Sequence, residues 1–230
     1  MIELHPDRAP LWLHPLLDGL DEATDANELL RHRMAPPPTD SRRAAVLMLF
    51  GHDPAHGPDV LLAERASTLR DHAGQVAFPG GGTDPGDAGP VATALREAEE
   101  ETGLEPSGVV PLALLPELYL PPSGFVVTPV VAHWERPTAV HAVDPGETAA
   151  VVRVPLAVLA DPASRLLVRH PSGLTAPAFT VAGLLVWGFT GALLSAVLDR
   201  GGWARPWDTT RVLDLERAWS AARAGRQEVW

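Results

Sequence analysis

Short apolar runs separated by turn-forming residues recur along the chain, and this pattern predicts a sheet built from many short strands. The runs that we interpret as strands are Ala44–Phe50, Asp59–Glu64, Val109–Leu115, Phe125–Trp134, Val151–Val154, Arg165–His170, Ala178–Val181 and Leu184–Phe189. Turn-forming residues fill the segment His52–Pro58 between the first two runs, so we expect those two strands to form a hairpin.

Fewer segments carry the pattern of a helix. We predict helices over Glu22–Met34, Pro90–Thr102, Pro155–Ala160, Thr190–Leu198 and Asp208–Ala222. The third of these would begin with proline, which the first helical position tolerates. The last would gather Val212, Leu215 and Trp219 on one side. Because strands follow one another with few helices between them, we expect an α+β fold with one mixed sheet sandwiched between helices (α/β/α).

The length of the chain suits a single domain. It has 230 residues, of which 46% are hydrophobic, enough for one full core. We expect an N-terminal extension over residues 1–40, a main domain over residues 41–205, and a C-terminal helix within residues 206–230 that packs on the main domain.

One uncharged stretch raises the question of a membrane. No charge occurs between Leu174 and Leu198, a length that hydropathy alone would assign to a membrane-spanning helix. Pro177 and three glycines interrupt this stretch, so a strand followed by a helix is the better interpretation. The N-terminal residues lack the basic and apolar regions of a signal peptide. We therefore expect a cytoplasmic protein with no membrane partner.

Charge and composition exclude several classes of activity. The net charge of −11 disfavours binding to nucleic acid or to an anionic membrane. The chain has no cysteine, and all 18 basic residues are arginine. Cysteine nucleophiles, cysteine-zinc sites, Schiff-base lysines and P-loop lysines are therefore ruled out.

The predicted helix Pro90–Thr102 concentrates the candidate chemistry. Four of the five residues from 97 to 101 are glutamate, and a glycine-rich turn precedes the helix. At about 100° per residue, Glu97, Glu100 and Glu101 fall within an arc of about 100°. Glu99 falls on the far side. Apolar residues occupy the neighbouring arc, so the helix would pack on a sheet and hold three carboxylates along its edge.

Two interpretations of this acidic cluster compete. Carboxylate oxygens suit hard divalent cations such as Mg²⁺ or Mn²⁺, and a glycine-rich turn lets backbone groups approach a ligand closely. The alternative is a solvated acidic helix surface. We favour the cation site because like charges on neighbouring turns repel, and because we expect no basic side chain to relieve that repulsion.

The spacing around this helix resembles the Nudix box, G-x5-E-x7-R-E-U-x-E-E-x-G-U, in which U is apolar. Gly82 begins the match, and the segment Arg96–Leu104 fits the second half at every position. Ala88 stands where the box has its first glutamate. Either the neighbouring Asp87 substitutes for it or that outer position is unused. Since the three helix glutamates are intact, we do not interpret the site as inactive.

The residues before the box narrow the resemblance. The segment Leu61–Gly81 is similar to the signature L-L-T-x-R-[SA]-x3-R-x3-G-x3-F-P-G-G of the coenzyme A pyrophosphatase branch of the Nudix family. Ala63 replaces the threonine. The tight match covers residues 61–104, and a looser similarity extends over about residues 40–205.

The resemblance implies a Nudix fold and the metal-dependent hydrolysis of a pyrophosphate bond. In the coenzyme A branch, the implied products are 3′,5′-ADP and 4′-phosphopantetheine or its acyl derivative. The implied ligands of Mg²⁺ or Mn²⁺ are Glu97, Glu100, Glu101 and the carbonyl of Gly81. Either Glu97 or a carboxylate outside the helix would take the proton of the attacking water. Glu147 is the leading candidate for that outside catalytic carboxylate, and Glu117 is its rival.

The resemblance also implies binding and structural roles. The implied substrate-binding residues are Arg65, Arg70, Gly80 and Gly81. Forked guanidinium groups suit the 3′-phosphate of coenzyme A. On the helical wheel, Arg96 falls at about 260° and so points away from the glutamate edge, where it would hold the loop or orient Glu100. Gly103 would end the helix in a left-handed conformation.

Three functions compete at this point. The leading one is a coenzyme A pyrophosphatase. The others are a broader pyrophosphatase acting on ADP-ribose or NADH, and a noncatalytic Nudix domain that senses a nucleotide. In each case the expected partner is a small molecule, and a homodimer is compatible with the sequence.

Overall fold

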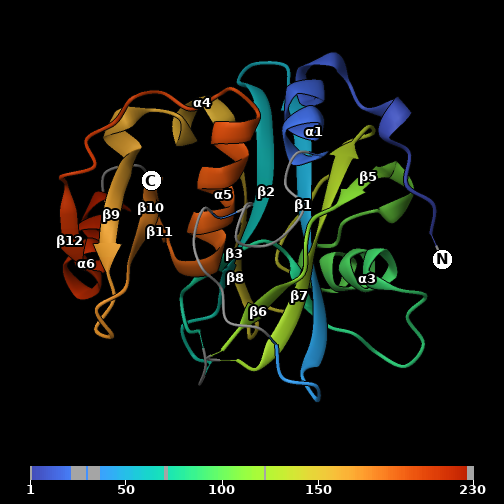
Figure 1. The fold of residues 1–230 in the computed structure, drawn as a ribbon, viewed down its shortest axis with the longest axis horizontal. Helices are drawn as coiled ribbons and strands as arrows, with labels where there is room; N and C mark the ends of the chain where they lie inside the picture. Colours follow the sequence, from blue (N-terminus) through green and yellow to red (C-terminus); the bar gives the residue numbers. More distant parts are fainter. Residues whose placement is uncertain (1, 22–29, 31–36, 70–71, 122, 227–230) are drawn as a thin grey trace.

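The structure is a computed structural model that describes residues 2–21, 30, 37–69, 72–121 and 123–226. Within these ranges the strands form two sheets, one of eight strands and one of four (Figure 1). Single helical turns of the 3-10 type lie at Pro6–Arg8 (η1), Leu11–Leu13 (η2), Pro106–Gly108 (η3) and Pro162–Ser164 (η4).

The larger sheet is mixed, as predicted. Its central order is β3 (Val76–Ala77), β2 (Gly57–Arg65), β1 (Arg42–Asp53), β7 (Phe125–Trp134) and β5 (Val109–Leu114). Three further strands join it: β4 (Gly80–Gly82) on β1, β6 (Leu118–Leu120) on β7, and β8 (Thr148–Pro155) on β2. Strands β1 and β7 run parallel, and the other pairs are antiparallel. The predicted hairpin of β1 and β2 is confirmed.

Helices cover both faces of this sheet because β1 is apolar on both sides. Leu47 and Leu49 pack toward α3 (Pro90–Thr102). Met48 and Phe50 pack on the opposite face, whose core also takes in α1 (His14–Asp21), α4 (Leu156–Leu159) and α5 (Gly188–Arg200). This alternation is the period of a strand buried on both faces. The predicted three-layer arrangement is therefore confirmed.

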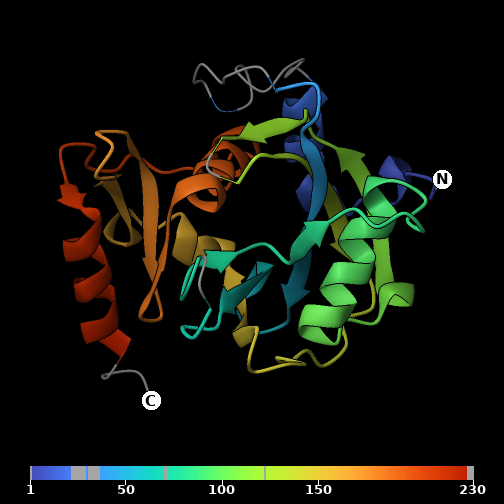
Figure 2. The same ribbon diagram turned by 90° about the horizontal axis from the view of Figure 1, so that it is seen from below.

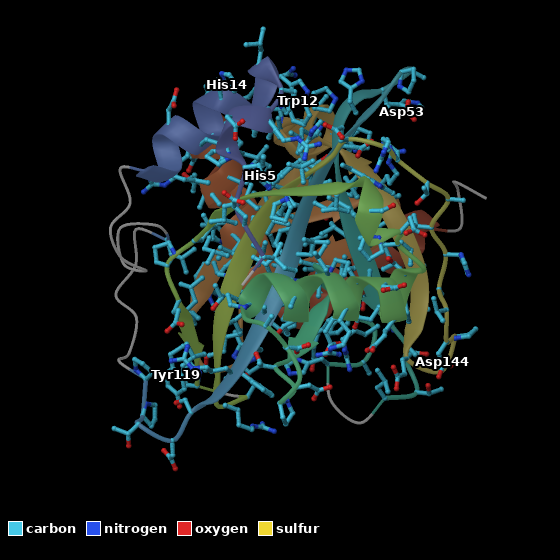
Figure 3. The ribbon with its side chains drawn as sticks, turned by 90° about the vertical axis from the view of Figure 1, so that its right-hand side faces the viewer. His5, Trp12, His14, Asp53, Tyr119 and Asp144 are labelled. Carbon is cyan, nitrogen blue, oxygen red and sulfur yellow. The ribbon has the colours of Figure 1, made fainter. Side chains whose placement is uncertain are left out.

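The N-terminal segment docks on the end of the sheet through Trp12 (Figure 3). The Trp12 ring lies 6.4 Å from the ring of His52, 6.3 Å from that of His133 and 6.3 Å from that of Trp203. The helix predicted over Glu22–Met34 falls outside the described residues, apart from Leu30.

The second sheet was not predicted. Its order is β11 (Leu184–Val186), β10 (Thr175–Val181), β9 (Arg165–Arg169) and β12 (Val212–Asp214), and α6 (Leu215–Arg226) packs on it. In Figures 1 and 2 this sheet and α6 lie on the side of the molecule away from α3. The stretch from Leu174 to Leu198 forms β10, β11 and α5, as the strand-and-helix interpretation expected. In the described ranges, no helix is long and apolar enough to cross a membrane.

Several predicted boundaries differ from the observed ones, and three of these differences have a clear local cause. The last helix begins at Leu215, because residues 212–214 extend and pair with β9 in parallel. Strand β11 ends at Val186, since Gly188 has φ +62° and α5 begins there. Pro155 is extended, with φ −59° and ψ 133°, so it closes β8 and α4 begins one residue later. The division of the chain at residues 40 and 205 stays a prediction.

Candidate active site

The glycine-rich turn is part of the larger sheet. Gly80 to Gly82 pair with Ala44 to Val46 of β1, and the amide of Leu47 donates to the carbonyl of Pro79 at 2.8 Å. A Cβ on Gly80 would lie 2.6 Å from Cα of Val46 and would overlap the carbonyl of Ala45. Only glycine therefore lets the turn come this close to β1. The amide of Gly80 then faces the helix and donates to Oε2 of Glu101 at 3.1 Å.

Because Gly81 has no side chain, there is room beside the carboxylate of Glu97. A Cβ on Gly81 would lie 2.5 Å from Oε2 of Glu97, closer than atoms pack. The side chain of Glu97 is 18% exposed, whereas that of Glu100 is 59% exposed. The turn and the helix thus enclose one glutamate and leave the other at the surface.

Helix α3 has the predicted bounds, Pro90–Thr102. Proline at the first position and Gly103 beyond the last set its ends. Gly103 has φ +65° and its amide donates to the carbonyl of Glu99 at 2.9 Å, which confirms the predicted left-handed cap. Val91, Ala94 and Ala98 are buried against the sheet, and Glu99 is exposed.

Arg96 lies at the centre of the acidic cluster. Its Nη1 donates to Glu97 at 3.0 Å and to Glu100 at 3.1 Å. Its Nη2 donates to the carbonyl of Gly82 at 2.9 Å, which holds the turn. The expectation that no basic side chain relieves the repulsion is wrong, because Arg96 stands four residues before Glu100. The guanidinium also does not point away from the glutamate edge; it bridges the edge and the turn.

Asp87 supplies a carboxylate beside the gap left by Ala88. Its two oxygens accept from Nε and Nη2 of Arg96 at 3.1 and 3.0 Å, and Oδ2 also accepts from the hydroxyl of Thr93 at 2.9 Å. These hydrogen bonds, that of Arg96 first, hold the pKa of Asp87 well below its usual range. Both oxygens of Asp87 are taken by these contacts, and the carboxylate orients Arg96. Whether Asp87 substitutes for the missing glutamate of the box stays a prediction.

Burial shapes the electrostatics of the other two glutamates. Burial raises the pKa of Glu101 to about 7; the Gly80 amide and the Arg65 charge oppose the rise, and the Glu97 and Glu147 charges add to it. Burial likewise raises the pKa of Glu97, against the hydrogen bond from Arg96. A cation beside these carboxylates would favour their ionised forms.

The loop that carries Glu147 is fastened to α3 and to β2. The amides of His141 and Val143 donate to the carbonyls of Thr102 and Glu101, at 2.9 and 3.3 Å. The carbonyl of Glu147 accepts from the amide of Ala66 at 2.8 Å. These contacts satisfy the last carbonyls of α3 and bring Glu147 close enough to act on the pKa of Glu101.

The turn before Glu147 depends on Asp144, which the sequence analysis missed (Figure 3). Oδ1 of Asp144 accepts from the amide of Gly146 at 2.7 Å, and its carbonyl accepts from the amides of Glu147 and Thr148. The signal was present as an Asp-Pro-Gly run, which is typical of turns. The rival carboxylate, Glu117, instead pairs with Arg43 at 2.6 Å.

Arg65 and Arg70 differ in what the structure describes. Arg65 ends β2, and its charge lowers the pKa of Glu101, so it lies beside the acidic cluster. Among the described residues, its Nε has no hydrogen-bond partner. Arg70 lies outside the described residues. The signature arginine at position 65 is thus next to the glutamate helix.

The oxygen atoms available at this site are of the type that binds a divalent cation. Three carboxylates, the Gly81 carbonyl and a space that a Cβ would fill are what a hard cation requires. In the described ranges, no three histidine, aspartate or glutamate side chains converge closely enough to hold a metal ion as they stand. Arg96 holds Glu97 and Glu100, and the Gly80 amide holds Glu101. Rotation of the exposed Glu100 side chain would open its carboxylate to a cation.

Comparison with known proteins places the chain in a family. The NUDIX domain model matches residues 40–172, more than half of the chain. The uncharacterized Nudix hydrolase NudL of Cronobacter sakazakii is 44% identical over 138 residues, 60% of this chain and 70% of the relative. NudL of Escherichia coli K12 is 41% identical over the same shares. The chain therefore belongs to the Nudix family, and the predicted family and fold are confirmed.

Two solved structures of Nudix hydrolases are among those similar to this chain. A Nudix hydrolase of M. smegmatis, RenU, aligns over 73% of this chain and 90% of its own, with 20% identity and a TM-score of 0.47. A Nudix hydrolase from Nitrosomonas europaea aligns over 77% and 81%, with 13% identity and a TM-score of 0.48. Nudix hydrolases act on pyrophosphate bonds of small nucleotide-like substrates and generally use divalent cations.

Proposed function

We propose that this protein hydrolyses the pyrophosphate bond of coenzyme A and its derivatives, with Mg²⁺ or Mn²⁺. The products are 3′,5′-ADP and 4′-phosphopantetheine or its acyl derivative. The observation that carries the proposal is the position of Arg65, an arginine of the coenzyme A signature, whose charge acts on Glu101 of the Nudix box. The specificity signature and the hydrolytic helix therefore meet at one place in the fold.

Glu97, Glu100, Glu101 and the Gly81 carbonyl hold the cation in this proposal. When bound, the cation neutralises phosphate charge, orients the attacking water and lowers its pKa. Arg96 keeps Glu97 and Glu100 on the same side of α3 through hydrogen bonds of 3.0 and 3.1 Å. Arg96 and Gly103 have structural roles in this proposal. Arg96 orients two of the glutamates, and Gly103 ends the helix that carries them.

The water's proton goes to Glu97 or Glu147. Glu97 is partly buried, and burial raises its pKa, which makes its carboxylate a stronger base than that of an exposed glutamate. Glu147 is exposed, but its backbone is tied to β2 by the hydrogen bond from Ala66. Glu117 is the weaker candidate because Arg43 already pairs with its carboxylate.

In this proposal Arg65, Gly80 and Gly81 bind the phosphates, and the Gly80 amide exchanges its Glu101 acceptor for a phosphate oxygen. A guanidinium group pairs with phosphate oxygens in a forked geometry, and the charge of Arg65 acts on Glu101 beside the glycine turn. Contact between Arg70 and the substrate rests on the resemblance alone. A homodimer and a cytoplasmic location stay predictions.

A substrate panel tests the proposal. The protein is incubated with CoA, acetyl-CoA, ADP-ribose, NADH and Ap4A in Mg²⁺ or Mn²⁺, and the products are identified by mass spectrometry. We expect 3′,5′-ADP and 4′-phosphopantetheine from CoA. Faster turnover of ADP-ribose would reject the coenzyme A assignment. Tight nucleotide binding without turnover would favour a sensor.

A further inference from the structure

Helix α6 lies beyond the residues that match the NUDIX domain, yet it reaches the loop that carries the coenzyme A signature. A Cβ on Gly74 would lie 3.6 Å from Cζ2 of Trp219 and 3.6 Å from Nη2 of Arg223. Gly74 stands in the loop between β2 and β3, with φ +67°. Two side chains of the C-terminal helix therefore contact the loop between β2 and β3, which carries part of the coenzyme A signature.

A shallow groove of about 300 Å³ lies between this loop and α6. It is lined by Ala73 of the loop and by Glu216, Trp219, Ser220 and Arg223 of the helix. The four helix residues follow the i, i+3, i+4, i+7 spacing of a single helix face. The groove thus offers an aromatic plane, a guanidinium, a hydroxyl and a carboxylate.

The aromatic wall of the groove is held in place from behind. The ring of Trp219 lies 6.1 Å from that of Trp187, which stacks on His170 at 6.0 Å. Ala218 and Ala222, on the inner face of α6, are buried against the second sheet. The guanidinium of Arg223 lies over the Trp219 ring, with its carbon 5.5 Å from the ring centroid, so a planar group on that face would share or displace this contact. Trp219 is therefore a fixed surface on which a planar group could stack.

One hairpin lies between the groove and the candidate active site. The amide of Gly74 donates to the carbonyl of Arg65 at 3.1 Å, and the amide of Arg65 donates to the carbonyl of Gln75 at 2.9 Å. Arg65 therefore faces the acidic cluster at one side of the hairpin, and Gly74 faces α6 at the other. A substrate whose pyrophosphate lies at Arg65 could extend across the hairpin into the groove.

We infer that this groove binds the 3′-phosphoadenosine half of coenzyme A, with the adenine stacked on Trp219 and the 3′-phosphate paired with Arg223. This inference rests on the proposed function. Bases stack on aromatic side chains, and guanidinium groups pair with phosphate. The pantetheine half carries neither an aromatic ring nor a phosphate dianion. Glu216 accepts a hydrogen bond from the exocyclic amino group of adenine, and Ser220 donates to the ribose or its phosphate.

Steady-state kinetics with two substrates test the assignment of Arg223. Dephospho-CoA lacks only the 3′-phosphate. We expect Arg223→Ala to raise KM for CoA about tenfold, the loss of one charge-assisted hydrogen bond, and to leave kcat unchanged. The same variant should leave KM for dephospho-CoA unchanged. Arg217→Ala is the matched control, because Arg217 is an exposed arginine of α6 that does not line the groove. Equal KM values for CoA in the wild type and Arg223→Ala would overturn the inference.

Binding of 3′,5′-ADP, measured by calorimetry without metal, separates this inference from the proposed function. We expect Arg223→Ala and Trp219→Leu each to weaken that binding about tenfold, with the melting temperature of Arg223→Ala unchanged. If the wild type does not hydrolyse CoA, the proposed function fails. The binding of 3′,5′-ADP still shows whether the groove is a nucleotide site. Equal dissociation constants in the wild type and Arg223→Ala would reject the groove.

Discussion

Arg96 determines where the carboxylates of the candidate active site point. One guanidinium contacts two metal-ligand candidates, the Asp87 carboxylate and the carbonyl of the glycine turn. The helical wheel placed Arg96 away from the cluster because it shows only the angle at which each residue leaves the helix axis. A long side chain can cross that angle, so the wheel found the three glutamates and missed the residue that orients two of them.

Glu100→Gln tests the metal-ligand role at a site where the fold does not depend on the charge. The side chain is 59% exposed, so the melting temperature should not change. We expect kcat/KM to fall about a hundredfold or more, beyond the range for residues that only support metal ligands. Glu99→Gln is the matched control, since Glu99 is exposed on the far side of α3. Full activity in Glu100→Gln would refute the role.

Asp87→Ala tests whether Asp87 substitutes for the missing glutamate of the box. The Asp87 side chain is 8% exposed and gives Arg96 its two-pronged partner. Its removal leaves a partly buried guanidinium without that carboxylate, so the free energy of unfolding should fall by about 2 kcal/mol. Urea denaturation measures this. Asp84→Ala is the control, because Asp84 is 68% exposed and lies 3.8 Å from Arg96. Equal stability of the Asp87 and Asp84 variants would contradict the assignment.

Elements with strong local end signals were predicted from sequence, and elements defined by distant pairing were not. Pro90 and Gly103 fixed the bounds of α3, and the apolar run Phe125–Trp134 fixed those of β7. Strand β12 is only three residues long and exists because β9 lies beside it. No local pattern marks such a strand, so it was assigned to the helix that follows.

The same reasoning applies to the candidate site. The box and the loop signature predicted Glu97, Glu100, Glu101 and Arg65, and the order of carboxylates in the family suggested Glu147. The charges of Arg65 and Glu147 both act on Glu101 of α3, and the roles of these residues stay predictions. The hydrogen bonds that fasten Glu147 to α3 and β2 join segments far apart in sequence. Sequence spacing does not show such contacts. Asp144 is a different case, because its hydrogen bonds are local and the Asp-Pro-Gly run signalled the turn that they hold.

The docking of the N-terminal segment should depend on pH through His133. Burial lowers the pKa of His133 below 6.5, with Glu135 opposing. Between the lowered pKa of His133 in the folded protein and 6.5 in the unfolded chain, the unfolded chain binds more protons. The contribution of neutral His133 to the free energy of unfolding is therefore present above pH 6.5 and is lost as the pH falls. We expect the melting temperature to fall from pH 6.5 to about 5 less steeply in His133→Phe, which keeps a ring against Trp12. Identical slopes in the two proteins would contradict this account.

The whole molecule adds two docked parts to the residues that match the NUDIX domain. The N-terminal segment packs through Trp12. The C-terminal part supplies α5, α6 and three strands of the second sheet, β10, β11 and β12. The net charge of −11 opposes an anionic substrate at long range. A bound cation and the arginines beside the glycine turn would have to offset that charge locally, which is why we expect catalysis to require divalent metal.

The ratio of kcat/KM for CoA to that for ADP-ribose tests the central claim most directly. Both substrates carry a pyrophosphate linked to adenosine, but only CoA carries the 3′-phosphate and the pantetheine arm. Measured on one preparation with Mg²⁺ or Mn²⁺, the ratio should exceed about tenfold, a difference of about 1.4 kcal/mol in transition-state stabilisation. A ratio below one would contradict the account, because the glutamate helix would then serve a general pyrophosphatase.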